Sequence, residues 1–367
     1  MLNEFIKRFD FSLLFLVIVL IVFSLVAQYS LSLSQQSRDF FLKHTFFVLL
    51  GIGCFFLFSI VDFRFWRKIT WILYLFCLLL LILVLFIGKT YRGVQGWIGI
   101  GNFGFQVSEL AKLVLILTLA KFWSGFKSTE IKKIIYSFFL CLGFIIPIYF
   151  QPDLGTGFIL FIIWLGSIFL VVKKKRYIIL LSIFLLIVGV VIWFYFLEPY
   201  QKSRILILFN PEVDKFGFGW QIRQSITAVG SGGLLGKGFS QGSQTYLRFL
   251  PAPGTDFIFA SFSEEFGFLG ASIVLISYFL LIFCLLKISA KSWDDFSFLF
   301  CLGVVIYFAF SLFINIGMNL GIAPIIGIPL PLMSYGGSSL LVTLIMLGMV
   351  EGILVHQPLR YNPDLQL

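Results

Sequence analysis

Long apolar stretches alternate with short polar ones along the whole chain. Because an α-helix rises about 1.5 Å per residue, roughly 20 apolar residues cross a hydrocarbon core of about 30 Å. The stretches predict about ten transmembrane helices, which form a single integral membrane domain over residues 1–367. Their approximate ranges are 12–31, 40–61, 69–88, 108–124, 134–150, 154–172, 178–197, 256–286, 296–322 and 334–356.

The composition removes the other classes of protein. Hydrophobic residues make up 60% of the 367 residues and charged residues 12%, whereas soluble domains average about 25% charged residues. Soluble domains of this composition would expose too much apolar surface, and a disordered chain needs low hydrophobicity. An outer-membrane barrel shows short alternating strands instead of long apolar runs. We therefore predict an all-α polytopic membrane protein.

The basic residues predict how the chain is oriented in the membrane. With the N-terminus in the cytoplasm, sixteen of the 27 Lys and Arg residues lie on the inner side and four near the short outer loops. Basic residues accumulate in short cytoplasmic loops, so we expect both termini inside and one large extracytoplasmic loop, 198–255, between helices 7 and 8. The inner residues are Lys7, Arg8, Arg64, Arg67, Lys68, Lys121, Lys127, Lys132, Lys133, Lys173, Lys174, Lys175, Arg176, Lys287, Lys291 and Arg360; the outer four are Arg38, Lys43, Lys89 and Arg92.

Membrane orientation also explains the net charge of +10, which in a soluble protein would suggest nucleic acid as a partner. We expect no nucleic-acid partner. The first apolar stretch follows Lys7 and Arg8 and has no small-residue cleavage site, so we interpret it as an uncleaved signal anchor.

Cysteine and histidine offer little chemistry. All five cysteines lie inside apolar stretches, where cysteine behaves as a small core residue and not as a disulfide partner or metal ligand. The only two histidines, His44 and His356, are far apart. This argues against a zinc site and against histidine-based catalysis.

The polar and glycine- or proline-rich features gather on the predicted outer side. They are the stretch 93–108, the turn 150–156, the loop 198–255 and the connection 321–337. The inner loops are short and basic. An active surface is therefore expected to be extracytoplasmic.

Charged residues within or at the mouths of spans are costly and by default suggest function. Glu109 and Lys112 have the i,i+3 spacing that places them on one helix face, where they form a structural ion pair or line a polar cavity. Asp153 either caps the helix that follows it or belongs to a site. Asp256 opens the eighth span, where it complements the helix dipole or does chemistry.

Two acidic positions deeper in the spans have a structural interpretation. One of Glu264 and Glu265 is expected to satisfy backbone groups or a lysine inside the bundle, and Glu351 is expected to be structural.

The large outer loop is rich in glycine between Gly230 and Gly242. Backbone amides of such turns can cradle phosphate, with Lys237 adding charge, but glycines also permit tight turns, and the spacing is not that of a nucleotide-binding loop. Gln221, Arg223 and Gln224 could lie along an amphipathic segment at the membrane interface. Basic groups, glycines and a carboxylate suit transfer from a phosphate-activated donor.

Several motifs together resemble one known family. The chain is similar, from about residue 12 to about 358, to the shape, elongation, division and sporulation family of membrane glycosyltransferases. In two places it departs from the family pattern: Val107 replaces a proline, and 252–254 replaces a more polar, often acidic and histidine-containing stretch. The motifs are Gln151–Thr156, Gly230–Gly233 with Gly236–Gly238, Thr255–Ala260, Asn315–Met318 and Gly327–Ser339.

The resemblance implies polymerisation of peptidoglycan at the outer face of the cytoplasmic (inner) membrane. The substrate would be lipid II, a disaccharide-pentapeptide on undecaprenyl pyrophosphate. The partners would be a class B penicillin-binding protein, which crosslinks the strands, and other membrane proteins of the elongation complex. The last two motifs look more like the elongation members than the division members. No metal ligand or certain cofactor is implied, although a divalent cation such as Mg²⁺ or Mn²⁺ would assist a pyrophosphate leaving group.

These implications lead to an inverting mechanism with Asp256 as the general base. Lys112, Arg204 and Lys237 are candidates to stabilise the leaving pyrophosphate, and Asp153 and Glu109 to orient the cavity. Three alternatives stay open: a flippase that moves lipid II between leaflets, a scaffold for the penicillin-binding protein, and a division-specific polymerase. The full set of predicted substrate-binding residues is Glu109, Lys112, Asp153, Arg204, Gln221, Arg223, Gln224, Lys237, Gln244 and Ser334.

Overall fold

Each of the ten predicted stretches forms a long helix in the computed structural model, which describes residues 8–34, 38–91, 93–100, 103–195, 197–210, 214 and 217–357. The prediction of an α-helical polytopic membrane protein is confirmed. In chain order the ten helices are α2 (Phe11–Ser34), α3 (Arg38–Ile60), α4 (Phe63–Ile87), α5 (Val107–Gly125), α6 (Glu130–Phe150), α7 (Leu154–Val171), α8 (Lys175–Tyr195), α12 (Ile258–Ala290), α13 (Asp295–Asn319) and α14 (Gly337–Val355).

The helices extend beyond the apolar stretches at their basic ends. α4 begins at Phe63, six residues before the stretch 69–88. Its first turn carries Arg64 and follows Asp62, whose carboxylate accepts a hydrogen bond of 2.8 Å from the Arg64 backbone N–H. Hydropathy marks the part of a helix that lies in hydrocarbon, so it misses a capped, charged turn at the membrane surface.

The central helix α5 differs from the other nine. Those nine are long and apolar enough to cross a membrane, as judged over the described residues. α5 carries Glu109, Lys112 and Lys121, yet most of its side chains are buried, and it packs against α4, α7, α13 and α14. A helix that is buried all round lies in the interior of a bundle, so Glu109 and Lys112, which are both buried, face protein and not lipid.

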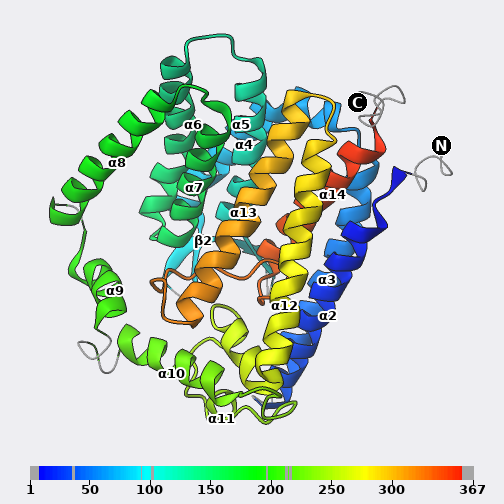
Figure 1. The fold of residues 1–367 in the computed structure, drawn as a ribbon, viewed down its shortest axis with the longest axis vertical. Helices are drawn as coiled ribbons and strands as arrows, with labels where there is room; N and C mark the ends of the chain where they lie inside the picture. The colour runs from blue at the N-terminus through cyan, green and yellow to red at the C-terminus, as the bar shows by residue number, and fades with distance from the viewer. Residues whose placement is uncertain are drawn as a thin grey trace.

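The two ends of the described chain meet at one end of the bundle. The Arg8 guanidinium donates to the backbone carbonyls of Val355 and Gln357. The short helices of the predicted outer loop, α9 (Pro199–Phe209), α10 (Phe218–Ser231) and α11 (Ser243–Tyr246), lie at the opposite end (Figure 1). This arrangement agrees with an even number of crossings. Which end faces the cytoplasm stays a prediction from the basic residues.

A small antiparallel sheet, which the sequence did not predict, precedes α5. Its strands are β1 (Lys89–Tyr91), β2 (Val94–Ile100) and β3 (Phe103–Gln106), in the order β1-β2-β3. Short strands that contain glycine give a weak sequence pattern. Since β3 runs directly into α5, the sheet is fixed to the N-terminal end of the central helix.

Candidate functional site

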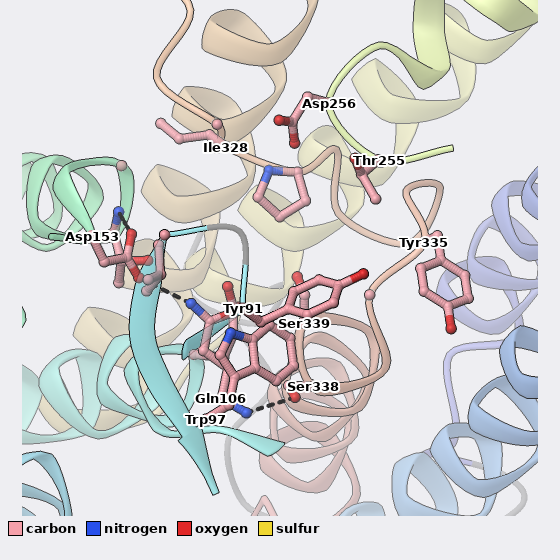
Figure 2. A pocket seen from close by; sticks show the side chains of 18 of the residues that line it. Tyr91, Trp97, Gln106, Asp153, Thr255, Asp256, Ile328, Tyr335, Ser338 and Ser339 are labelled. Carbon is pink, nitrogen blue, oxygen red and sulfur yellow. Dashed lines mark hydrogen bonds between the residues drawn. The ribbon is translucent and has the colours of Figure 1, made fainter. Parts of the chain in front are cut away.

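A cavity of about 910 Å³ opens at the end of the bundle that carries α9 to α11. All four polar segments noted in the sequence contribute to its wall: the stretch 93–108, the turn 150–156, the loop 198–255 through α9 and α10, and the connection 321–337. Residues of α3, the start of α14 and Asp256 also contribute. Figure 2 shows Asp153, Asp256, Trp97 and Tyr335 around this space. The structure therefore joins segments as far apart as Phe40 and Ser339 into one chamber, which we call the outer chamber.

Asp256 lines the outer chamber from the segment just before α12. The helix begins at Ile258, so Asp256 precedes the first turn instead of lying in it. Its backbone carbonyl accepts hydrogen bonds from the side-chain amides of Asn315 (3.1 Å) and Asn319 (3.0 Å). The Asn319 side-chain oxygen also accepts from the Ala260 N–H at 3.1 Å. Two fully buried amides thus fix the backbone that carries the carboxylate.

Asn315 and Asn319 were not proposed as site residues from the sequence, although Asn315 belongs to a family motif. The signal was available, because two amide side chains at i,i+4 in an apolar span must find partners. What the sequence did not contain was the partner, a carbonyl 59 to 63 residues away.

The connection before α14 passes close to Asp256. Gly327 has a φ of 76°, and a Cβ atom there would lie 3.8 Å from the Asp256 Oδ2 atom. Ser334 accepts a hydrogen bond of 2.8 Å from the Leu330 N–H and donates one of 2.6 Å to the Thr255 carbonyl. Ser334, which we predicted to bind substrate, instead ties this connection to the neighbour of Asp256 and does not line the chamber.

Glu109 and Lys112 form the predicted ion pair. Their Oε1 and Nζ atoms are 2.7 Å apart, and their side chains are 5% and 2% exposed. Both residues line the base of the chamber. Since the lysine charge is matched by its neighbour, the pair adds polarity to the chamber but no net positive charge.

Asp153 caps α7, as predicted, and also joins two other helices. Its Oδ1 atom accepts from the Thr156 N–H at 3.0 Å. Its Oδ2 atom accepts from Ser108 at 2.9 Å and from the Gln106 side chain at 3.0 Å. The Gln106 N–H donates to Ser338 at the start of α14 (2.9 Å). The starts of α5, α7 and α14 are thereby held together beneath the chamber (Figure 2).

The positive charges of the chamber come mainly from residues that the sequence analysis used only for topology. Lys43 and Lys89 line it, together with the predicted Arg204 and Gln221. The Arg204 guanidinium lies 4.4 Å from the centre of the Phe218 ring, a cation–π distance. Nothing local in the sequence indicated that α3 and β1 would bring lysines to the same cavity as Arg204.

Aromatic side chains form another part of the wall that we did not predict. Trp97, Tyr91, Phe40 and Tyr335 line the chamber, with the Tyr91 and Trp97 ring centres 5.7 Å apart and those of Phe40 and Tyr335 5.6 Å apart. Partial burial, with a smaller contribution from Tyr91, raises the pKa of the Tyr335 hydroxyl above its ordinary value. Tyr335 is therefore a neutral hydrogen-bonding group at physiological pH.

Lys237 and Gln244, which we also predicted to bind substrate, lie outside the chamber. The Lys237 Nζ atom pairs with Glu264 at 2.8 Å, and the Gln244 N–H donates to the same carboxylate at 2.9 Å. We predicted that either Glu264 or Glu265 would satisfy backbone groups or a lysine inside the bundle. Glu264 is the residue that does so. Arg223 and Gln224 on α10 do not contribute to the chamber wall either.

The glycine-rich stretch of the outer loop has a structural role in place of a phosphate cradle. α12 is broken at Gly267, which has a φ of 66° and a ψ of −165°. The freed carbonyls of Glu264 and Glu265 accept from the N–H groups of Lys237 and Gly238, both at 3.0 Å. A Cβ atom at Gly236 would lie 2.1 Å from the Glu265 carbonyl oxygen. The glycines allow the loop to dock onto the broken helix, and these amides are used there.

The donor set does not form a ready-made metal site. Among the described residues, no group of three or more His, Cys, Asp or Glu side chains could hold a metal ion. Of the chamber carboxylates, Glu109 pairs with Lys112 and Asp153 accepts three hydrogen bonds. The described residues of the chamber therefore offer no preformed set of ligands for a resident Mg²⁺ or Mn²⁺ ion. A divalent cation stays a prediction, and no step below passes through one.

Comparison with known proteins gives a consistent result. The family model for FtsW, RodA and SpoVE, described as a cell cycle protein, matches residues 7–358. The chain is 37% identical over 294 residues to peptidoglycan glycosyltransferase MrdB of Escherichia coli, covering 78% of this chain and 77% of that protein. It is 31% identical to peptidoglycan glycosyltransferase RodA of Treponema pallidum, covering 96% and 99% of the two chains.

A solved structure has the same fold. It comes from work on how a peptidoglycan synthase complex coordinates polymerization and crosslinking, and its chain superimposes with a TM-score of 0.83 at 29% identity. The match covers 95% of this chain and 99% of that chain.

Proposed function

This chain belongs to the FtsW/RodA/SpoVE family of cell cycle proteins, and we propose that its outer chamber is where glycan strands are polymerised. It is a peptidoglycan glycosyltransferase, as its curated relatives are named. The observation that carries the assignment of the site is Asp256, a carboxylate whose backbone is fixed by two buried asparagines at the wall of the outer chamber.

Asp256 acts as the general base in this proposal. It removes the proton from the 4-hydroxyl of the acceptor sugar while that oxygen attacks the anomeric carbon of the donor. The bond between the anomeric carbon and the diphosphate oxygen breaks, and the diphosphate leaves with the electron pair. A single displacement inverts the anomeric centre, so no covalent enzyme intermediate forms. A positioned base of this kind typically contributes a factor of about 10² to 10⁴.

The leaving diphosphate requires positive charge. Some of the lysines first considered for this role are already paired with carboxylates. Lys112 is neutralised by Glu109, and Lys237 lies elsewhere with Glu264. The cationic groups in the wall that do not belong to those two pairs are Arg204, Lys43 and Lys89. Arg204 keeps the role predicted for it, and Lys43 and Lys89 take the role first given to Lys112 and Lys237, because preorganised charge stabilises an anion that develops in the transition state.

The substrate we propose is lipid II, and the compartment is the outer face of the cytoplasmic membrane. The partner is a class B penicillin-binding protein acting with the elongation complex. The relative that is itself named RodA and the solved synthase complex support this choice. The flippase and the pure scaffold are less well supported, since the relatives carry the names of glycosyltransferases. The division role stays the alternative, because relatives named FtsW match at 33% and 35% identity.

The test uses the purified full chain in liposomes that carry lipid II in the leaflet facing the large loop. Polymer formed without added protein other than the partner supports the proposal. Exchange of lipid II between leaflets with no polymer, measured with a labelled lipid II and an external quencher, would contradict it and favour the flippase. A scaffold would produce neither polymer nor exchange.

A further inference from the structure

One row of side chains runs across the small sheet and faces the outer chamber. The strand register pairs Lys89 of β1 with Trp97 of β2, and Trp97 with Gln106 of β3. All three residues line the chamber. Figure 2 shows Trp97 and Gln106 close together and apart from Asp256. Neighbouring residues across a sheet are about 5 Å apart, so the row is about 10 Å long.

The indole of Trp97 is held in the middle of this row. The next pair on the same face consists of two glycines, Gly99 and Gly104, which also line the chamber. A Cβ atom at Gly104 would lie 3.1 Å from the Trp97 ring atom Cε3, so the glycine leaves the indole room to lie over β3. Tyr91 meets the indole edge-on, with an angle of 69° between the rings. Trp97 therefore presents a ring in a fixed position, next to a pair of glycines that add no side chains to this face of the sheet.

The two ends of the row differ in chemistry. At one end, Lys89 is exposed and forms no ion pair with any described residue. At the other end, the Gln106 amide is held by Asp153 through its side chain and by Ser338 through its backbone. The row thus offers a cation, a flat apolar ring and a fixed amide in sequence.

We propose that this row is a binding subsite for the glycosyl diphosphate end of a lipid-linked saccharide. The diphosphate pairs with Lys89, the apolar face of the adjoining sugar ring lies on the Trp97 indole, and a hydroxyl or N-acetyl group meets the Gln106 amide, which can both donate and accept. A glycosyl diphosphate has these three features in the same order. The inference rests on the proposed function and adds the residues that recognise its substrate.

The position of the row relative to Asp256 supports this use. Because the row and the carboxylate lie apart in one chamber (Figure 2), a sugar on Trp97 does not occupy the place of the reacting hydroxyl. The row therefore binds and positions substrate, whereas Asp256 handles the proton.

The experiment measures lipid II polymerisation by the purified full chain with its partner, using Trp97→Ala, Trp97→Phe and Lys89→Gln. Tyr246→Ala and Lys202→Gln are matched controls, since both residues lie in the outer loop and away from the chamber wall. We expect Trp97→Ala to raise KM about tenfold with kcat within about twofold of wild type, as for the loss of one aromatic contact. Trp97→Phe, which keeps a ring, changes KM less than about threefold.

Competition with undecaprenyl diphosphate, which has no sugar, separates the two ends of the row. Lys89→Gln is expected to weaken its inhibition by up to about fivefold, the size of an exposed ion pair, whereas Trp97→Ala leaves that inhibition unchanged. A wild-type KM in Trp97→Ala overturns the proposal. So does a lower kcat and melting temperature at unchanged KM, which would mark a purely structural tryptophan.

Failure of the proposed polymerase function can be distinguished from failure of the binding row. If the wild-type chain forms no polymer, the polymerase assignment fails, and direct binding of labelled lipid II to wild type and Trp97→Ala still tests the row. If Trp97→Ala does not fold, Trp97→Phe and Lys89→Gln carry the same comparison.

Discussion

The side-chain amide of Asn319 donates a hydrogen bond of 3.0 Å to the backbone carbonyl of Asp256. The donor ends α13 and the acceptor precedes α12, so the bond couples two helices at the point where the carboxylate enters the chamber. The Asn319 side chain is fully buried and its oxygen also accepts from the buried Ala260 N–H, so removing it leaves a buried donor unsatisfied at a cost of about 1–3 kcal/mol.

We expect Asn319→Ala to lower kcat about tenfold, because the carboxylate is no longer held at one position. The matched control is Ser311→Ala on the same helix, whose buried hydroxyl has no partner among the described residues. Its removal is expected to leave kcat and the melting temperature unchanged. Equal losses in both variants would show that the effect comes from α13 packing and not from Asp256.

The Glu109–Lys112 pair predicts that the stability losses caused by replacing each partner alone do not add in the double variant. Removing one partner leaves an uncompensated charge in the bundle, which costs about 3–5 kcal/mol. Glu109→Gln and Lys112→Gln are therefore each expected to lower the melting temperature, whereas the double variant recovers most of the loss. The melting temperatures of all four proteins in detergent give the coupling. Simple addition of the two losses would contradict a buried, mutually neutralising pair.

Helix α7 approaches the connection 321–337 closely, and this contact predicts different effects for two glycines of α7. A Cβ atom at Gly155 would lie 2.7 Å from the Ile326 carbonyl oxygen, whereas one at Gly157 meets only a methyl group at 3.9 Å. Gly155→Ala is expected to displace the connection and reduce polymerisation at least tenfold. Gly157→Ala is expected to be neutral or more stable by up to about 1 kcal/mol.

The comparison of these two variants needs only polymerisation rates and melting temperatures. A normal rate for Gly155→Ala would mean that the connection does not set the geometry near Asp256.

Lys237 is expected to matter for stability and not for substrate affinity. Its partner Glu264 is fully buried and also accepts from Ser243 and Thr245. Lys237→Ala should lower stability by about 1–3 kcal/mol while KM for lipid II, measured on the folded fraction, stays within about twofold. A large rise in KM at unchanged melting temperature would restore Lys237 as a diphosphate ligand.

The features predictable from the sequence are those set by local spacing. A span needs only its own apolar residues, the Glu109–Lys112 pair needs only i,i+3 spacing, and the Asp153 cap needs only the helix that follows it. These predictions agree with the structure.

The features that were missed depend on contacts between distant segments. The break of α12 at Gly267 creates the carbonyls that the Gly-rich loop satisfies, and no local pattern specified that match. Trp97 and Lys89 became chamber residues only because a short sheet formed at the N-terminal end of α5. Side chains such as Lys43, counted only for topology, gained a proposed role once six helices and the sheet enclosed one cavity.

The most direct test of the central claim is the single-turnover rate of glycosidic bond formation by purified Asp256→Asn with its partner. The change keeps the shape of the side chain but removes the base, so the rate is expected to fall by a factor of about 10² to 10⁴ at an unchanged melting temperature. The control is Asp39→Asn, an exposed carboxylate at the same end of the bundle and outside the chamber wall, which should react at the wild-type rate. A folded Asp256→Asn protein that forms bonds at a near-normal rate would contradict the assignment of Asp256 as the general base.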